Sequence, residues 1–212
     1  MTDDLITRLA ADLKPVRRHA LTHLVVGAVL ASAVFAAIAM LAWLGPRPDM
    51  GWARDTMMFW TKFGYTLALG VVGGAATLAL ARPDGAIRWP LLAAPGLLAL
   101  VLVIGAVQLM VAPPEQTMPL IMGGTAMVCP WRIIALSLPI LLALLLALRR
   151  LAPASPTLAG LAAGLFAGGT GAWIYSFACG ENGMMFLALW YTLGIALVAA
   201  LGALLGRFLL RW

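Results

Sequence analysis

Six long stretches of apolar residues, separated by short polar connections, dominate the pattern of this chain. A transmembrane helix needs about 20 mostly apolar residues, because each residue advances about 1.5 Å across a hydrocarbon core roughly 30 Å thick. The pattern therefore predicts an all-α integral membrane protein, a bundle of six transmembrane helices. The expected bounds are Leu24–Leu44, Met57–Leu80, Leu91–Ala112, Ile133–Leu148, Leu158–Phe177 and Met185–Leu209.

The fourth stretch is shorter than the others and contains Pro139. We expect this helix either to begin earlier, near Thr125, or to be kinked at the proline, which helix bundles tolerate when neighbours satisfy the freed carbonyl. The connections between stretches are short. The sequence thus divides into an N-terminal tail, residues 1–23, and a six-helix domain, residues 24–212.

The composition agrees with a membrane protein and disfavours a soluble enzyme. Hydrophobic residues make up 63% of the 212 residues and charged residues 10%, against about 25% charged residues in an ordinary soluble domain. The net charge is +6, but the cations lie at the ends of apolar stretches. Direct contact with nucleic acid would need them gathered on one face, so none is expected.

The lysines and arginines also predict the orientation. If the six stretches cross the membrane in alternation, the tail, the second and fourth connections and the C-terminus lie on one side of it. These segments carry ten of the 14 lysines and arginines, and the other side carries four. By the positive-inside rule the side with ten is cytoplasmic. We therefore expect a bacterial inner-membrane protein with both termini in the cytoplasm.

Polar groups are scarce within the six stretches, which disfavours a small transporter or permease, since such proteins need polar groups at mid-membrane. Lys62 lies about one turn inside the second stretch and is expected to snorkel to the interface. Glycines recur at helical spacing in the second, fifth and sixth stretches. They favour close packing within the bundle, with a homodimer face as the alternative.

Two cysteines are the main candidates for chemistry. Cys129 precedes the fourth stretch and Cys179 follows the fifth, so the predicted orientation places both on the periplasmic side, where a disulfide is permitted. They form either a structural staple, two unrelated thiols, or a redox- or metal-sensitive pair with Glu181 as a third ligand. A membrane thiol oxidoreductase would ordinarily need a second thiol pair.

The N-terminal tail carries an apolar stripe. Leu5, Leu9 and Leu13 recur every four residues with Ile6 beside them, and Pro15 ends the element. This spacing predicts a short amphipathic helix. Two interpretations are equally open: the helix lies on the lipid headgroups, or a cytosolic protein receives its stripe in a groove.

The sequence resembles the NrsF-type negative regulators of sigma F, a family of membrane-bound anti-sigma factors. The resemblance covers nearly the whole chain, and its most specific parts are the block that begins at Cys129 and the block Trp190-Tyr-Thr-Leu-Gly194. The matching stretches are Asp12-Leu-Lys-Pro-Val-Arg-Arg18, Cys129-Pro-Trp-Arg-Ile-Ile-Ala-Leu-Ser-Leu-Pro139, Leu148-Arg-Arg-Leu-Ala-Pro153, Ala159-Gly160, Tyr175 to Cys179, Phe186-Leu-Ala-Leu-Trp-Tyr-Thr-Leu-Gly194 and Leu210-Arg-Trp212.

The resemblance implies a non-enzymatic signalling protein without a cofactor. Its cytoplasmic tail would sequester an extracytoplasmic-function sigma factor, and periplasmic stress such as heavy metal or oxidation would release it. The implied sensor residues are Cys129 and Cys179. The sigma-contacting positions that the resemblance implies are Asp12, Pro15, Arg17 and Arg18. The leucines of the stripe, Leu5, Leu9 and Leu13, are candidates for the same contact from their spacing. A His often precedes the second cysteine in the family, and here Ala178 stands there, which favours thiol oxidation over metal ligation.

Overall fold

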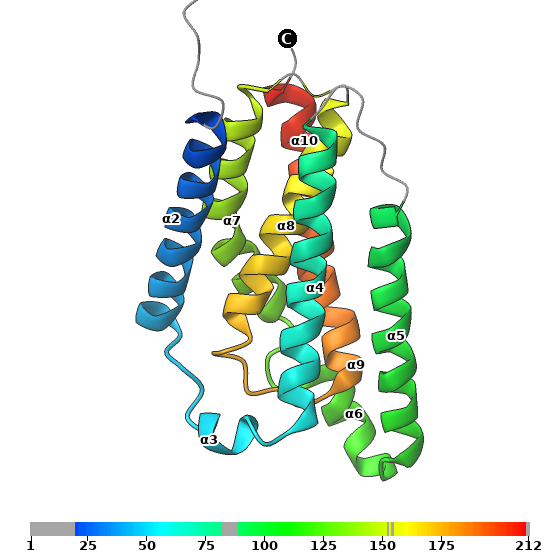
Figure 1. The fold of residues 1–212 in the computed structure, drawn as a ribbon. Coiled ribbons are helices and arrows are strands. Elements are labelled where there is room, and N and C mark those ends of the chain that lie inside the picture. The colour runs from blue at the N-terminus through cyan, green and yellow to red at the C-terminus, as the bar shows by residue number, and fades with distance from the viewer. Residues whose placement is uncertain (1–19, 82–88, 152, 154, 211–212) are drawn as a thin grey trace, which may run out of the picture.

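The computed structural model describes residues 20–81, 89–151, 153 and 155–210, and these residues form helices and no strands (Figure 1). Six helices in this part of the chain are long and apolar enough to cross a membrane. The predicted all-α six-helix fold is confirmed. The helices are α2 (Ala20–Trp43), α3 (Met50–Ala53), α4 (Met57–Leu80), α5 (Trp89–Val111), α6 (Pro114–Met122), α7 (Cys129–Leu148), α8 (Pro156–Tyr175), α9 (Met184–Phe186), the π-helix η1 (Leu187–Tyr191) and α10 (Thr192–Leu209).

The fourth predicted span begins at Cys129, between the two starting points that the sequence suggested. Pro130 stands in its first turn, where a missing backbone N–H costs nothing. The helix then continues through Pro139 to Leu148. The sixth predicted span is three consecutive pieces, α9, η1 and α10, because the backbone forms a π-helical turn at residues 187–191.

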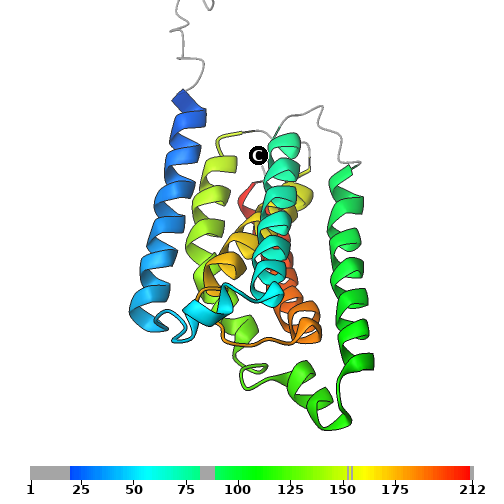
Figure 2. The same ribbon diagram turned by 60° about the horizontal axis from the view of Figure 1, so that its bottom comes forward.

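Helix α8 lies at the centre of the bundle and packs most extensively against α10 and α4, and then against α7 (Figure 2). The glycines that recur at helical spacing in the second, fifth and sixth stretches make this close packing possible. A Cβ atom at Gly164 would lie 2.6 Å from the Ala199 Cα of α10, and one at Gly73 would lie 2.8 Å from the Phe166 Cα of α8. These glycine faces are therefore occupied inside the bundle, where helix backbones approach without side chains between them.

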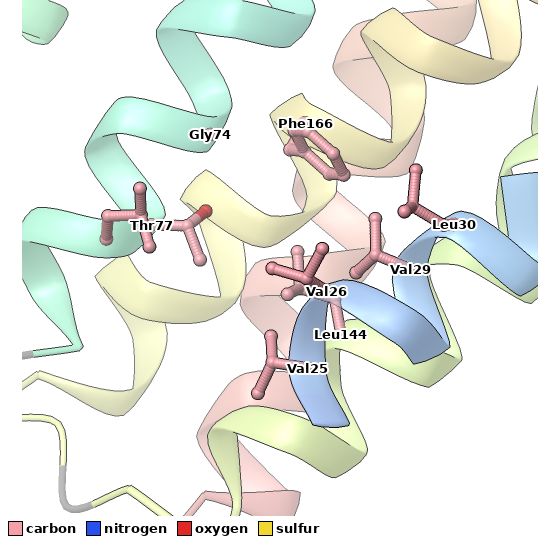
Figure 3. Close-up of a pocket in the computed structure, with 9 residues that line it drawn as sticks. Val25, Val26, Val29, Leu30, Gly74, Thr77, Leu144 and Phe166 are labelled. Atoms are coloured by element: carbon pink, nitrogen blue, oxygen red, sulfur yellow. The ribbon is translucent and has the colours of Figure 1, made fainter. Parts of the chain in front are cut away.

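Helices α2 and α5 stand at the outside. Helix α2 rests mainly on α7, and α5 rests on α4 and α9. Between α2 and α4 remains a cavity of about 200 Å³ lined by side chains such as Val26, Leu30 and Phe166 (Figure 3). Its Thr77 hydroxyl already donates to the Gly73 carbonyl, at 2.8 Å. Among the described residues that line the cavity, Thr77 alone has a polar side chain, and its hydroxyl proton is already bonded.

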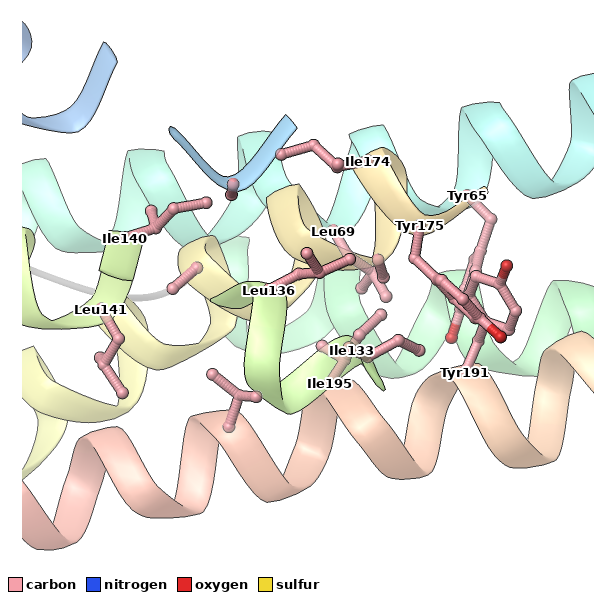
Figure 4. Packing of buried hydrophobic residues seen from close by; sticks show 14 of the residues in the cluster. Tyr65, Leu69, Ile133, Leu136, Ile140, Leu141, Ile174, Tyr175, Tyr191 and Ile195 are labelled. Carbon is pink, nitrogen blue, oxygen red and sulfur yellow. The ribbon is translucent and has the colours of Figure 1, made fainter. Parts of the chain in front are cut away.

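The two ends of the bundle differ. One end, the lower one in Figure 1, holds α3, α6 and the connection from α8 to α9, and we refer to it as the α6 end. The beginning of α2 and the end of α10 lie at the opposite end. Buried aliphatic side chains fill the middle of the bundle, while Tyr65, Tyr175 and Tyr191 gather at one side of this core (Figure 4).

Candidate sensor site at the α6 end

Charged side chains enter the bundle at the α6 end, although the helices around them are apolar. Lys62 is fully buried and Arg47 is 3% exposed. Both reach the connection between α8 and α9, residues 176–183, which we call the Cys179 segment. Buried charges are costly unless they are paired or hydrogen-bonded, so the partners of these two cations define the site.

Lys62 does not snorkel to the interface, and that prediction is wrong. Its ammonium donates to the carbonyl oxygen of Cys179 at 3.2 Å and to that of Glu181 at 2.7 Å. The nitrogen also lies 5.5 Å from the centre of the Tyr191 ring, within cation–π range. The reason lies in the tertiary structure. The Cys179 segment lies beside the second turn of α4, and two of its backbone carbonyls take the place of water around the Lys62 ammonium.

Arg47 holds the same segment from the connection between α2 and α3. Its backbone N–H donates to Phe177 O at 3.0 Å, and its guanidinium donates to Cys179 O at 3.3 Å. The carbonyl of Cys179 therefore accepts from two buried cations. The guanidinium also makes a bidentate pair with Asp49, at 2.6 and 2.7 Å, which lowers the pKa of Asp49 and raises the pKa of Arg47.

Glu181 links the Cys179 segment to the turn that precedes Cys129. Its carboxylate accepts from the backbone N–H of Gly124 and from the hydroxyl of Thr125, both at 2.9 Å. The backbone N–H of Cys129 in turn donates to Thr125 O at 2.8 Å. Within the described residues no group of three or more His, Cys, Asp or Glu side chains could hold a metal ion, so the geometry does not support Glu181 as a third ligand.

Both predicted sensor cysteines belong to this site. Cys129 is fully buried and Cys179 is 3% exposed, and both are free thiols. The chain of contacts through Thr125 and Glu181 brings them to one end of one core cluster. A pair of buried thiols can undergo oxidation or bind a soft metal, and both reactions need access by a small reagent.

Aromatic rings close the site toward the core. The rings of Tyr175 and Tyr191 lie 5.6 Å apart, and Arg132 donates to the Tyr175 hydroxyl at 3.4 Å. The Tyr191 hydroxyl is buried without a hydrogen-bond partner among the described residues. Tyr191 ends the π-helix η1, and single π-helical turns are frequent at functional sites.

The other predicted site residues have no described position. Leu5, Leu9, Asp12, Leu13, Pro15, Arg17 and Arg18 lie outside the described residues. In contrast, sequence reasoning missed the roles of Lys62 and Arg47. The available signal was a lysine inside an apolar span, because ionisable residues at such positions are generally functional.

Fold and site together define a six-helix membrane-type protein with two buried thiols and two buried cations at one end, and with an α2–α4 cavity whose described lining is almost entirely apolar. The sequence profile of the family described as "Negative regulator of sigma F" (NrsF) matches residues 9–212. The chain belongs to this family.

Two curated relatives cover the whole chain. The anti-sigma-F factor NrsF of Caulobacter vibrioides is 41% identical over 218 aligned residues, covering 100% of this chain and 99% of the relative. The probable anti-sigma-F factor NrsF of Azospira oryzae is 40% identical over 212 residues, with coverage of 100% and 99%. No solved structure matches the chain significantly.

Proposed function

We propose that this protein is a membrane-bound anti-sigma factor that holds an extracytoplasmic-function sigma factor through its N-terminal segment. The observation that carries the proposal is the full-length similarity to two relatives named as anti-sigma-F factors. The six-helix fold supports it, because the long helices that the structure describes are joined by short connections, which favours the tail as the place for a protein partner. This role needs no catalysis, and we propose that the protein is not an enzyme.

The proposed contact is the apolar stripe of the tail, with Leu9 at its centre. A buried Leu contributes about 1.5–3 kcal/mol, and a carboxylate in its place adds a desolvation cost. We therefore expect Leu9→Asp to weaken sigma-factor binding at least tenfold. Ala11→Asp is the matched control, because a helix with this stripe would place residue 11 on the opposite face.

The measurement is a pull-down from detergent-solubilised membranes, followed by binding titration with the sigma factor that is recovered. Leu9→Asp should reach the membrane in normal amounts and lose the partner, while Ala11→Asp should retain it. Equal binding by Leu9→Asp and the unmodified protein would contradict the groove proposal and favour the tail as a membrane-surface helix.

The proposed location is the bacterial inner membrane, with both termini in the cytoplasm and the α6 end in the periplasm. The excess of Lys and Arg on one side supports this orientation. Reporter fusions after Leu151 and Trp212 should be active only when the reporter works in the cytoplasm. Fusions at Pro48 and Gln116 should be active only outside, and an externally active fusion at Trp212 would reverse the proposed topology.

We further propose that Cys129 and Cys179 sense periplasmic stress, such as heavy metal or oxidation, as one unit. Their shared site and buried contacts support this role. The α2–α4 cavity, with its hydroxyl already bonded, gives no support to a transporter, and one thiol pair gives little to a thiol oxidoreductase. The described glycine faces pack within the chain, so we do not extend the proposal to a homodimer through them.

A further inference from the structure

The hydroxyl groups of Tyr65 and Thr192 form a pair inside the bundle. Their oxygen atoms lie 2.6 Å apart, and Tyr65 is 4% exposed. Helix α4 begins at Met57, so its rise to Tyr65 is about 12 Å. This places the pair at the depth of the hydrocarbon region of a membrane, where lipid supplies no hydrogen-bond acceptor.

The pair has one more proton than its hydrogen bond uses. Each hydroxyl carries one proton and can also accept a hydrogen bond. One of the two donates to the other, whichever it is. The second proton then has no acceptor among the described residues. Because an unmade hydrogen bond of a buried group is unfavourable, the pair favours an acceptor from outside the chain.

Other hydroxyls in the spans are satisfied by their own helix. Each of the following donates to the backbone carbonyl four residues earlier: Thr61, Thr66, Thr77, Ser137 and Thr170. Thr192 differs because it directly follows the π-helical turn η1. Backbone bonds in such a turn run to the fifth residue rather than the fourth, which changes the positions of the carbonyls behind Thr192. Its hydroxyl bonds with Tyr65 instead.

A cavity of about 180 Å³ adjoins the pair, between α4, α5, α8 and α10. Tyr65 and Thr192 supply the only polar side chains among the described residues that line it, and the rest of the lining is apolar, as at Leu69. Pro95 and Ala196 of the lining are exposed, so the cavity reaches the lipid-facing surface. Since an apolar cavity of about 150 Å³ holds one benzene, this one has room for a single six-membered ring with small substituents.

These features define a ligand by its chemistry. It must be apolar and uncharged, because charges are costly at this depth, and it must bring an acceptor for the remaining hydroxyl proton. We propose that the cavity binds the ring of a lipid-soluble quinone, and that one carbonyl oxygen of the ring accepts the proton of the Tyr65–Thr192 pair. A phospholipid ester also carries a carbonyl, but its charged headgroup holds that carbonyl nearer the membrane surface. The proposal is independent of sigma-factor binding.

The test compares two ligands of the same shape. One is a benzoquinone with a decyl chain, and the other has methyl groups in place of both carbonyl oxygens. Binding to the full-length protein in lipid nanodiscs is measured by equilibrium dialysis, with empty nanodiscs to subtract uptake by lipid. We expect one quinone per chain, bound about tenfold more tightly than the methyl compound.

The variants test whether this preference comes from the pair. Tyr65→Phe combined with Thr192→Val removes both hydroxyls and should bring the two affinities within about twofold of each other. Thr77→Val removes a hydroxyl from the α2–α4 cavity and should leave the preference unchanged. Ala94→Phe fills the cavity from α5 and should abolish binding of both ligands. Gly96→Phe should not, because Gly96 has open space around its Cβ position and does not line the cavity.

Equal affinity of the unmodified protein for the two ligands would overturn the proposal, and this result does not depend on the folding of any variant. A preference for the quinone that survives the loss of both hydroxyls would also overturn it, since the carbonyl would then bind elsewhere. Nanodiscs of ester-linked and ether-linked phospholipid with one headgroup identify a competing occupant. Weaker quinone binding in the ester lipid would show that a lipid ester occupies the pair, and the assignment to a quinone would be wrong.

Discussion

Gly160→Leu should destabilise the native helix bundle strongly. Gly160 of α8 faces α10 at the closest approach of the two helices. A Cβ atom there would lie 2.9 Å from the Gly206 Cα and closer still to the Gly202 carbonyl oxygen. These are backbone atoms, which cannot turn aside as a flexible side chain would, so the helices must separate. Overpacking ordinarily costs about 1–3 kcal/mol, and we expect at least the upper value here.

Thermal unfolding in mild detergent and size-exclusion chromatography measure this effect. A loss of about 3 kcal/mol corresponds to a midpoint lowered by roughly 6–12 °C in a chain of this size. Gly27→Leu is the matched control, because Gly27 lies on α2 with open space around its Cβ position. A Gly160→Leu protein as stable as the Gly27→Leu protein would show that the α8–α10 contact does not hold the bundle together.

The helices of this protein could be predicted from hydropathy because lipid leaves the backbone no alternative to helix along an apolar stretch. The span Met57–Leu80 has the predicted bounds. The predicted ends at Leu148 and Leu209 are also confirmed. The remaining helix ends differ from the predicted ones by up to four residues, because a helix can continue into a polar connection or end before it. The π-helical turn at Leu187–Tyr191 has no sequence signature in an apolar run, since only tertiary packing decides which carbonyl each N–H reaches.

The site could be predicted only in part. The positions of Cys129 and Cys179 beside spans four and five, together with the alternation of spans across a membrane, indicate a shared end. Their burial and the contacts of Lys62 depend on how residues 176–183 fold back over α4, and no local pattern encodes that path. A lysine near a helix end ordinarily reaches water, and here the carbonyls of Cys179 and Glu181 receive it.

The contacts of the Cys179 segment suggest how a change at the thiols reaches the rest of the bundle. The segment is held by Arg47 from the α2 side, by Lys62 from α4 and by the Gly124–Thr125 turn before α7. A bond that draws Cys129 and Cys179 together therefore acts on three helices at once. Helix α7 ends at Leu148, beside the exposed Arg149 and Arg150 at the opposite end, where the proposed orientation places the cytoplasm.

Cys129→Ser and Cys179→Ser should each abolish release of the sigma factor in response to oxidant or soft metal. A disulfide or a bridging metal needs both sulfur atoms, so removal of either loses the whole response, and the double variant should be no worse than either single one. Such non-additivity marks residues that act as one unit. We expect induction of sigma-dependent transcription to fall at least tenfold in all three variants, with basal repression unchanged.

A transcriptional reporter for the partner sigma factor, read with and without oxidant or Ag(I), measures the response. Ala178→Ser is the control, because it introduces the same hydroxyl next to Cys179 and leaves both thiols in place. Constitutive transcription in a cysteine variant would indicate that the thiol holds the repressing conformation, as a structural staple does. A normal response in one single variant and none in the other would show that the cysteines have separate roles, and the paired-thiol mechanism would be wrong.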